Sequence, residues 1–215
     1  LHLFTLSSNQ ESWFESFDGG VNWQPTTTGF RQFGTYPVKS GNQSGLAYIP
    51  KQLAISPANP NHWLLLDSPG VLASYDAGRT WARVGVVRNE EDSASYSDIA
   101  WDPRDPHKVW ATSNKGRVLI GSNFGTPNET WEERQIGPDT AFFNLIRFSR
   151  SGAYIYLTEI SNQGSIYRSQ DFGQTFTKVS DPIHCAPQCG YNDALWLNPK
   201  NASELVLGGV QLYHS

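Results

Sequence analysis

The sequence repeats an imperfect octet, and the spacing of its copies constrains the fold more than any other feature. The copy at residues 74–81 reads SYDAGRTW, and two others read SFDGGVNW at 16–23 and SQDFGQTF at 169–176. A fourth copy, SNFGTPNETW at 122–131, keeps the first Ser and the last Trp but lacks the Asp. The opening serines are 58, 48 and 47 residues apart. Such a period is typical of solenoids and propellers.

Each interval between octets predicts the same series of four short strands. In the second interval, residues 52–56 alternate, 63–66 are continuously apolar, 70–74 lead into the octet and 81–84 leave it. The later intervals repeat this pattern at 98–101, 109–112, 118–122 and 131–134, and at 145–148, 154–158, 166–169 and 176–179. Proline-containing turns separate the first two strands of a unit. The pattern predicts an all-β chain, a β-propeller of four-stranded blades.

The octet between the third and fourth strand of a unit resembles the Asp-box, also called the BNR repeat. This repeat occurs in sialidases, in Vps10/sortilin-type sorting receptors, in xyloglucan-cleaving propellers and in secreted propellers labelled sialidase-like. The stretches CGYNDALWLNP at 189–199 and LGGVQLYHS at 207–215 are most similar to the last group. The resemblance covers nearly the whole chain. It implies Asp-box hairpins and approximate blade units at 1–45, 46–92, 93–140, 141–187 and an incomplete 188–215.

The residue types of the octet favour a turn over an active site. Ser and Asp side chains bond main-chain groups of turns, Gly accepts a positive φ, and the closing aromatic ring can be buried between sheets. A metal site built on Asp18, Asp76 or Asp171 is the alternative. The structural residues of the four copies are Ser16, Asp18, Gly20, Trp23, Ser74, Asp76, Gly78, Trp81, Ser122, Gly125, Trp131, Ser169, Asp171, Gly173 and Phe176.

The two ends of the chain predict an incomplete propeller. Residues 3–25 supply the second, third and fourth strands of a unit, whereas residues 194–215 supply the first three. The second and third strands are therefore duplicated, and the two ends cannot complete a single blade. We expect an internal fragment of a longer chain, in which Ser215 opens a fifth octet.

Polar and aromatic residues just before or within the first strand of each unit are the candidate binding residues. These strands converge on the central axis of a propeller, where rings beside carboxylates and amides suit a glycan or a peptide. The alternative is that Asp and Asn only cap the strand entrances. The candidates are Tyr96, Asp98, Asn144, Arg147, Tyr191, Asn192 and Asp193.

The catalytic sets of related enzymes are not apparent in the chain. A sialidase needs an arginine triad for the substrate carboxylate, but Arg147 is the only arginine within a predicted inner strand. Xyloglucan-cleaving relatives place two carboxylates across a cleft, for which Asp98 and Asp193 are weak candidates because they lie two blades apart. Apart from the alternative metal site at the octet aspartates, no residue pattern indicates a metal, and none indicates a cofactor.

Composition limits the partners and suggests a compartment. A net charge of −4 provides no basic face for nucleic acid, and no apolar run approaches the length of a membrane span. Cys185 and Cys189 are close enough for a local disulfide, with free thiols as the alternative. Sequons at Asn42, Asn128 and Asn201 fit a secreted, cell-surface or luminal protein.

These observations favour a binding or scaffold propeller, extracellular or luminal, that recognises a glycan or a protein. One alternative is a glycoside hydrolase, sialidase-like or xyloglucanase-like, whose catalytic residues lie partly outside this segment. The second alternative is the ectodomain of a Vps10-type sorting receptor. Other subunits of a larger extracellular assembly are further candidate partners.

Overall fold

The computed structural model describes residues 3–6, 13–25, 52–67, 70–85, 95–161, 164–180, 193–209 and 211–215, and these contain strands and turns but no helix. The strands are β1 (Leu3–Leu6), β2 (Trp13–Ser16), β3 (Gln24–Pro25), β4 (Gln52–Ile55), β5 (Trp63–Asp67), β6 (Gly70–Ser74), β7 (Ala82–Val84), β8 (Tyr96–Trp101), β9 (Val109–Ser113), β10 (Arg117–Ser122), β11 (Thr130–Gln135), β12 (Phe143–Phe148), β13 (Ile155–Glu159), β14 (Ser165–Ser169), β15 (Thr177–Lys178), β16 (Ala194–Leu197), β17 (Leu205–Gly208) and β18 (Leu212–His214).

The described strands form five antiparallel sheets in which chain order equals spatial order. Their orders are β1-β2-β3, β4-β5-β6-β7, β8-β9-β10-β11, β12-β13-β14-β15 and β16-β17-β18. We call these sheets blades 1 to 5. The prediction of an all-β chain built from four-stranded blades is confirmed, with strand ends within about two residues of those expected.

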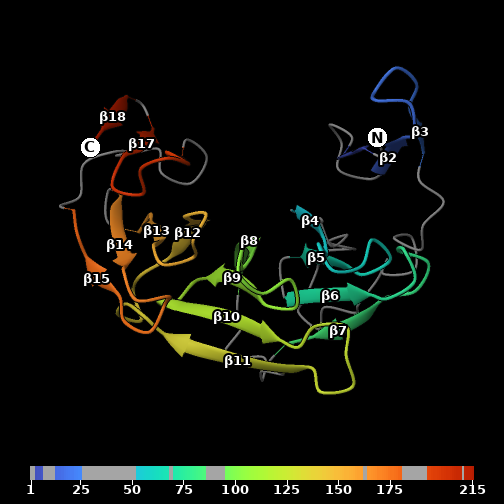
Figure 1. The fold of residues 1–215 in the computed structure, drawn as a ribbon, viewed down its shortest axis with the longest axis horizontal. Helices are drawn as coiled ribbons and strands as arrows, with labels where there is room; N and C mark the ends of the chain where they lie inside the picture. Colours follow the sequence, from blue (N-terminus) through green and yellow to red (C-terminus); the bar gives the residue numbers. More distant parts are fainter. Residues whose placement is uncertain are drawn as a thin grey trace, which may run out of the picture.

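The blades follow one another around an open arc (Figure 1). Strands β4, β8 and β12 lie toward its inner side, and β7, β11 and β15 lie at its rim. Inner strands of successive blades are in contact, β4 with β8, β8 with β12 and β12 with β16. The arrangement is that of a partial propeller, as the sequence predicted.

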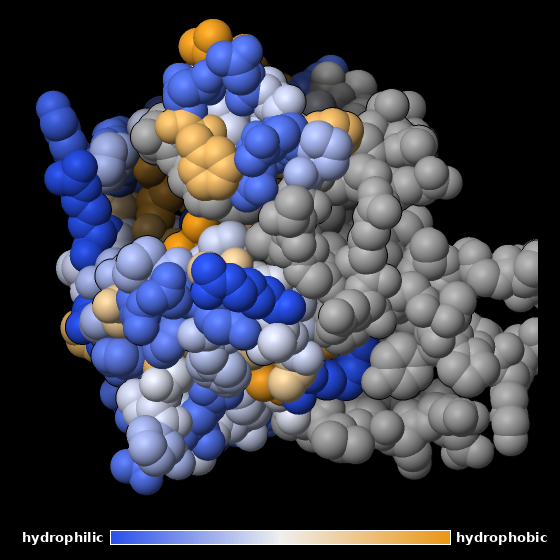
Figure 2. All heavy atoms as spheres, turned by 90° about the vertical axis from the view of Figure 1, so that its right-hand side faces the viewer, coloured by the Kyte–Doolittle hydropathy of each residue, from blue (hydrophilic) through white to orange (hydrophobic). Residues whose placement is uncertain are grey.

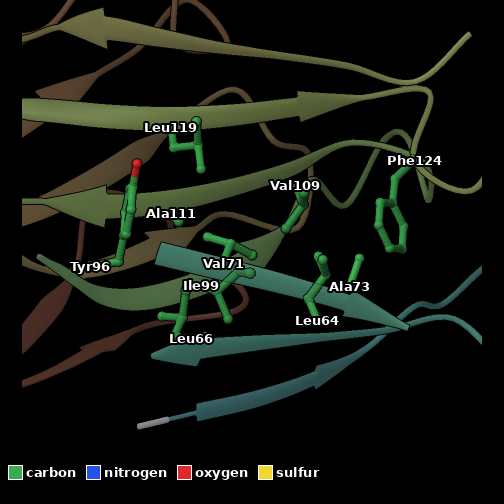
Figure 3. Close-up of a cluster of buried hydrophobic side chains, with 10 residues drawn as sticks. All are labelled: Leu64, Leu66, Val71, Ala73, Tyr96, Ile99, Val109, Ala111, Leu119 and Phe124. Atoms are coloured by element: carbon green, nitrogen blue, oxygen red, sulfur yellow. The ribbon is translucent and has the colours of Figure 1, made fainter. Parts of the chain in front are cut away.

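Apolar side chains fill the space between successive blades. Between blades 2 and 3, side chains of β5 and β6 meet those of β8, β9 and β10 (Figure 3). A second cluster joins blades 3 and 4, and a third joins blades 4 and 5. Because a middle blade has a neighbour on each face, β6, β9 and β13 are buried along their whole length. Their sequences, GVLAS, VWATS and IYLTE, accordingly lack the apolar-polar alternation of a strand with one exposed face, and their polar residues lie at the ends of the strands.

One face of the described surface is mostly polar. Figure 2 shows a face on which hydrophilic side chains predominate and apolar ones appear in small, separate areas. The exposed large apolar residues include Trp196 and Leu212 of blade 5, which are 53% and 79% exposed. Among the described residues, the buried apolar side chains form clusters between the blades.

The first strand of blades 3 and 4 contains a β-bulge that the sequence did not reveal. The pairing of β8 with β9 shifts between Tyr96 and Ile99, and that of β12 with β13 shifts between Phe143 and Ile146. With the bulge included, β8 and β12 begin at Tyr96 and Phe143, two residues before the starts at 98 and 145 that the sequence predicted. Bulges bend a strand and redirect its side chains, and these two lie beside the candidate site residues.

The contact between blades 3 and 4 predicts a large loss of stability on truncation. Ile146 is fully buried in the second cluster, whereas Ile55 of β4 is 37% exposed. Ile146→Ala should lower the free energy of unfolding by about 2–5 kcal/mol. The matched change Ile55→Ala should cost less than about 1 kcal/mol. Urea denaturation of both variants measures this, and equal losses would contradict the proposed packing.

Candidate functional site

Four of the candidate residues form a connected polar network on the inner strands. Asp98 lies in β8, Asn144 and Arg147 lie in β12, and Asp193 directly precedes β16. The contacts of β12 with β8 and β16 bring these residues together from three blades. The network therefore lies on the inner strands, and the binding role of its residues stays a prediction.

Asp98 connects blade 3 to blade 4 through its carboxylate. The residue is only 5% exposed. Its Oδ1 accepts the N–H of Ile99 at 2.9 Å, and its Oδ2 accepts the N–H of Ile146 at 3.0 Å. The Arg147 Nη1 group donates to the same Oδ2 in an ion pair. A buried carboxylate is stable in such a setting because its charge is paired and its lone pairs accept hydrogen bonds.

Arg147 extends the network to blade 5. Its Nε donates to the carbonyl of Leu195 at 3.2 Å, and its Nη1 also donates to the carbonyl of Ile146 at 2.6 Å. The side chain is 38% exposed. None of the described residues accepts a hydrogen bond from Nη2, so this edge of the guanidinium offers two N–H donors. A planar guanidinium of this kind suits a carboxylate, a carbonyl or a sugar hydroxyl.

Asn144 and Asp193 form a second connection between blades 4 and 5. Asn144 Nδ2 donates to Asp193 Oδ2 at 3.0 Å, and the Thr158 hydroxyl donates to the same oxygen. The Thr158 Oγ1 also accepts the Leu145 N–H at 3.0 Å. Asp193 therefore receives donors from two strands of the neighbouring blade.

Threonines of the second strands satisfy backbone groups at both bulges. Thr112 Oγ1 accepts the Asp98 N–H at 3.0 Å, in the same manner as Thr158 and Leu145 in the next blade. The Thr112 hydroxyl donates to the Asn144 carbonyl at 2.9 Å. These threonines were not among the candidates, because single Thr residues in apolar strands give no distinctive sequence signal.

Gln52 of β4 is a further residue that sequence reasoning missed. Its Oε1 accepts the Ile99 N–H at 3.1 Å and its Nε2 donates to the Ile99 carbonyl at 3.4 Å, which joins blade 2 to blade 3. Gln52 and Asp98 each directly precede the aliphatic residue of their inner strand, Leu53 and Ile99. A polar residue directly before the aliphatic residue of an inner strand is the sequence signal that could have identified Gln52.

The strand register places the Asp98 and Asp193 carboxylates at different positions in their blades. Asp98 directly precedes Ile99, which pairs with Ala111, whereas Asp193 lies two residues before Leu195, which pairs with Leu207. The two residues therefore do not occupy equivalent positions in their blades. Their carboxylates already accept donors from neighbouring strands, and the geometry does not present them as a free pair.

Tyr96 does not line the axial face. It is 3% exposed, belongs to the apolar cluster between blades 2 and 3, and its hydroxyl donates to Glu133 Oε1 at 3.0 Å. Phe143, at the corresponding position of blade 4, is also fully buried. The bulges explain this placement, because they turn the first aromatic residue of each strand into the core. Tyr191 and Asn192 lie outside the described residues.

The octets with an Asp form hydrogen-bonded turns. In residues 74–81, Ser74 Oγ donates to Asp76 Oδ1 at 2.8 Å and accepts the Gly78 N–H at 2.8 Å. The Asp76 carboxylate accepts hydrogen bonds from the Thr80 N–H at 2.8 Å and from the Thr80 hydroxyl at 2.6 Å. The Trp81 indole N–H donates to the Gly78 carbonyl at 2.9 Å. Gly78 has a φ of 81°, and the preceding Ala77 has a φ of 59°.

The copy that lacks Asp forms a comparable turn with a different carboxylate. Glu129 Oε2 accepts the Gly125 N–H at 2.9 Å, and its Oε1 accepts the Trp131 indole N–H at 2.8 Å. The hydroxyl of Tyr75, from blade 2, donates to the same carboxylate at 2.8 Å. Burial, followed by proximity to Glu129, raises the pKa of Tyr75. Glu129 thus takes the place of the missing Asp and adds a contact between blades.

The copy that ends in Phe has a related compensation. Phe176 has no indole N–H to donate to the carbonyl of Gly173. Arg134 of blade 3 donates its Nη1 to that carbonyl instead. The guanidinium of Arg134 also lies 5.3 Å from the centre of the Trp110 ring. The neighbouring blade therefore supplies the donor that the octet itself lacks.

Two of the predicted glycosylation sites lie on exposed turns. Asn128 is exposed between β10 and β11, and Asn201 is exposed between β16 and β17. Asn42, Cys185 and Cys189 lie outside the described residues. Within the described residues there is no group of three or more potential metal ligands, and no helix long and apolar enough to cross a membrane.

Comparisons with known proteins find similarity in fold. No protein-family model matches the sequence, and no curated protein matches it. An ancestral GH74 enzyme shares 19% identity at a TM-score of 0.67, over 96% of this chain and 25% of that one. The GH74 xyloglucanase of Xanthomonas campestris shares 14% identity with this chain at a TM-score of 0.69, and the match covers 100% of this chain and 34% of the xyloglucanase. YCF48 from Cyanidioschyzon merolae shares 14% identity at a TM-score of 0.60, and the match covers 99% of this chain and 65% of YCF48.

These similarities support a β-propeller fold. The chain spans between a quarter and two thirds of the length of the three structures. At identities below one fifth, they show the fold alone. The function must therefore be argued from the residues of this chain.

The octet aspartates predict how stability depends on pH. Hydrogen bonds lower the pKa of Asp18, Asp76 and Asp171 from 3.8 to about 2, mainly through the Asn22 N–H, the Thr80 hydroxyl and the Thr175 hydroxyl, respectively. Because the folded pKa is below the unfolded one, the stabilisation is complete above about pH 4 and is lost as the pH falls toward 2.

The triple variant Asp18→Asn, Asp76→Asn, Asp171→Asn should therefore have a smaller change in thermal midpoint between pH 4 and pH 2 than the unmodified chain. Asp139→Asn, an exposed change outside the octets, is the control. An unchanged pH dependence in the triple variant would refute the role assigned to these turns.

Proposed function

We propose that this chain is part of a binding or scaffold propeller that recognises a glycan or protein ligand at the inner ends of its blades. The observation that carries the proposal is the state of the two candidate carboxylates. Asp98 accepts donors from Ile99, Ile146 and Arg147, and Asp193 accepts donors from Asn144 and Thr158, all of which belong to the blades themselves. Carboxylates bound in this way hold blades together, and they are poorly placed to transfer protons to a substrate.

Arg147 is the residue best placed to contact a ligand. Asp98 and the Leu195 carbonyl orient its guanidinium, while Nη2 remains available at the inner surface. The pre-orientation lowers the entropy cost of forming a paired contact with a carboxylate or with neighbouring hydroxyl groups. Acidic glycans and acidic peptides are the ligand classes that this group favours.

The binding role of Arg147 is tested with the purified chain on a glycan array and on an array of acidic peptides. For the strongest ligand found, Arg147→Ala should weaken binding by about tenfold, the loss of roughly one charge-assisted hydrogen-bonded contact. Arg147→Lys keeps the charge but loses the planar fork, and should weaken binding less. Arg150→Ala changes an exposed arginine on the neighbouring turn and is the matched control. Equal binding by all variants would refute the role of Arg147.

A glycoside hydrolase is the second candidate function, and the fold shared with GH74 enzymes favours testing it. Such an activity would require a pair of free carboxylates across a substrate. The purified chain is therefore incubated with xyloglucan and with a panel of fluorogenic glycosides. We expect no cleavage. Cleavage that is abolished by Asp98→Asn or Asp193→Asn in a folded variant would overturn the binding proposal.

We further propose that the octets are Asp-boxes and that the protein is secreted, on the cell surface or luminal. The turn hydrogen bonds support the first statement, and the exposed sequons at Asn128 and Asn201 support the second. Expression through the secretory pathway of a eukaryotic cell should give a product that loses mass on treatment with an N-glycosidase. Asn128→Gln and Asn201→Gln should each remove one glycan. An unglycosylated wild-type product would contradict this use of the sequons.

A further inference from the structure

The octet of blade 4 carries an aromatic residue where the other two octets with an Asp carry a small one. The residue between the Asp and the Gly is Gly19 in blade 1, Ala77 in blade 2 and Phe172 in blade 4. All three have a positive φ, of 80°, 59° and 62°. This backbone conformation is costly for a residue with a side chain, and a bulky residue rarely adopts it. Turn formation alone therefore does not account for Phe172.

The ring of Phe172 lies outside the apolar packing between the blades. The residue is 43% exposed, and it belongs to none of the three apolar clusters. The exposed ring of Tyr75 in blade 2, by contrast, contacts the rings of His62 and Phe124, and its hydroxyl donates to Glu129. None of the described aromatic rings pairs with that of Phe172. Contacts within the fold therefore do not explain why this ring is at the surface.

The guanidinium of Arg104, from blade 3, lies over this ring in a fixed orientation. Its central carbon is 4.4 Å from the centre of the Phe172 ring. The buried carboxylate of Asp102 accepts hydrogen bonds from Arg104 Nε at 3.0 Å and from Nη2 at 2.8 Å. Gly152 allows Arg104 to approach closely, because a Cβ at this glycine would lie 2.6 Å from Arg104 Nε. Arg104 Nη1 donates to none of the described residues, so it is available beside the exposed ring.

Two exposed amide side chains flank Phe172 in the sequence. Gln170 lies two residues before it and Gln174 two residues after it, and both are exposed. An amide group carries an acceptor oxygen and two N–H donors. The contact of blades 3 and 4 therefore combines an aromatic ring, a guanidinium N–H and two amides. Both blades have a described neighbour on each side, so the ring is not exposed at an open end of the arc.

The turns that carry these groups, at 102–108, 149–153 and 169–176, have no net charge when His107 is neutral. Three basic side chains balance three acidic ones, namely Arg104, Lys108 and Arg150 against Asp102, Asp105 and Asp171. A surface without excess charge does not favour an ionic ligand. Sugar hydroxyls both donate and accept hydrogen bonds, and the C–H face of a pyranose packs against an aromatic ring. An uncharged glycan therefore matches the chemistry of this surface.

We propose that Phe172, Arg104, Gln170 and Gln174 form a binding site for an uncharged glycan at the octet end of blades 3 and 4. A pyranose ring packs against the exposed ring of Phe172. Arg104 Nη1 donates to one hydroxyl oxygen of the sugar, and the two amides bond neighbouring hydroxyls. The strained backbone of Phe172 is retained because its ring provides this contact.

This site is separate from the inner surface to which the binding role of Arg147 was assigned. Arg104 follows the end of β8, whereas Asp98, the ion-pair partner of Arg147, lies near the beginning of that strand. The two sites also differ in ligand class, since Arg147 favours acidic ligands. The proposal therefore does not rest on the function proposed for the inner surface.

The site is tested by NMR titration of the purified chain with three neutral probes, cellotetraose, chitotetraose and mannotetraose. The amide signals of residues 170–174 should shift with at least one of them. Phe172→Ala should weaken this binding by about tenfold, because the ring that packs against the sugar is removed. The fold accommodates Ala at this position, since Ala77 occupies it in blade 2. Leu212→Ala, which truncates an apolar side chain that is 79% exposed, is the matched control and should leave binding unchanged.

Two further measurements separate this site from a structural role of the ring and from the inner surface. The thermal midpoint of Phe172→Ala should stay within about 4 °C of that of the unmodified chain. Tetragalacturonate, an acidic probe, should bind Phe172→Ala and the unmodified chain equally, whereas Arg147→Ala should weaken its binding. Failure of this acidic probe counts against Arg147 alone. Unshifted amides at 170–174 with all three neutral probes, or equal affinity of Phe172→Ala and the unmodified chain, would overturn the proposal.

Discussion

The fold is held together by the packing of each blade face against the face of the next blade. A four-stranded sheet has two faces, and it can bury them only against neighbouring blades. Three apolar clusters provide these contacts between blades 2 and 5. Strands such as β6, β9 and β13 are buried on both faces, so removal of a neighbouring blade would expose a continuous apolar surface. The octets fix the turns that maintain this spacing.

Hydrogen bonds between the inner strands fix the relative position of blades that the apolar clusters hold together. Gln52, Asp98 and Arg147 each bond a backbone group in the next blade. Apolar contacts tolerate small shifts, whereas a hydrogen bond to a particular N–H or carbonyl fixes the register of two strands. The same residues form the candidate site. Its carboxylates accept hydrogen bonds from the neighbouring blades, while Arg147 retains a partly exposed face, and the proposed binding function rests on this combination.

The repeat of the octet allowed the fold to be predicted from the sequence. Its spacing located the strands, and the alternation around each octet showed which segments pair. The inner strands were also located, and Asp98, Asn144, Arg147 and Asp193 lie on or directly beside them, while their role in binding stays a prediction. The prediction succeeded to this extent because turn chemistry and apolar periodicity are local properties of the chain.

Features that depend on contacts between blades could not be predicted. The bulges that bury Tyr96 and Phe143 arise from the pairing of two strands, and a single strand does not reveal them. Glu129 replaces an octet Asp from a different position, and Arg134 supplies a donor from the neighbouring blade. In both cases the compensating residue lies outside the motif. The role of Gln52 became visible only when the register of β4 and β8 was known.

Asp98 connects blade 3 to blade 4 through the Ile146 N–H, which donates to its Oδ2 at 3.0 Å. Amide hydrogen exchange at Ile146, measured by NMR, tests this connection. In a folded Asp98→Ala variant, exchange at Ile146 should accelerate by about a hundredfold, while amides of β6 in blade 2 keep their protection. Unchanged protection of Ile146 in that variant would show that Asp98 does not hold the two blades together.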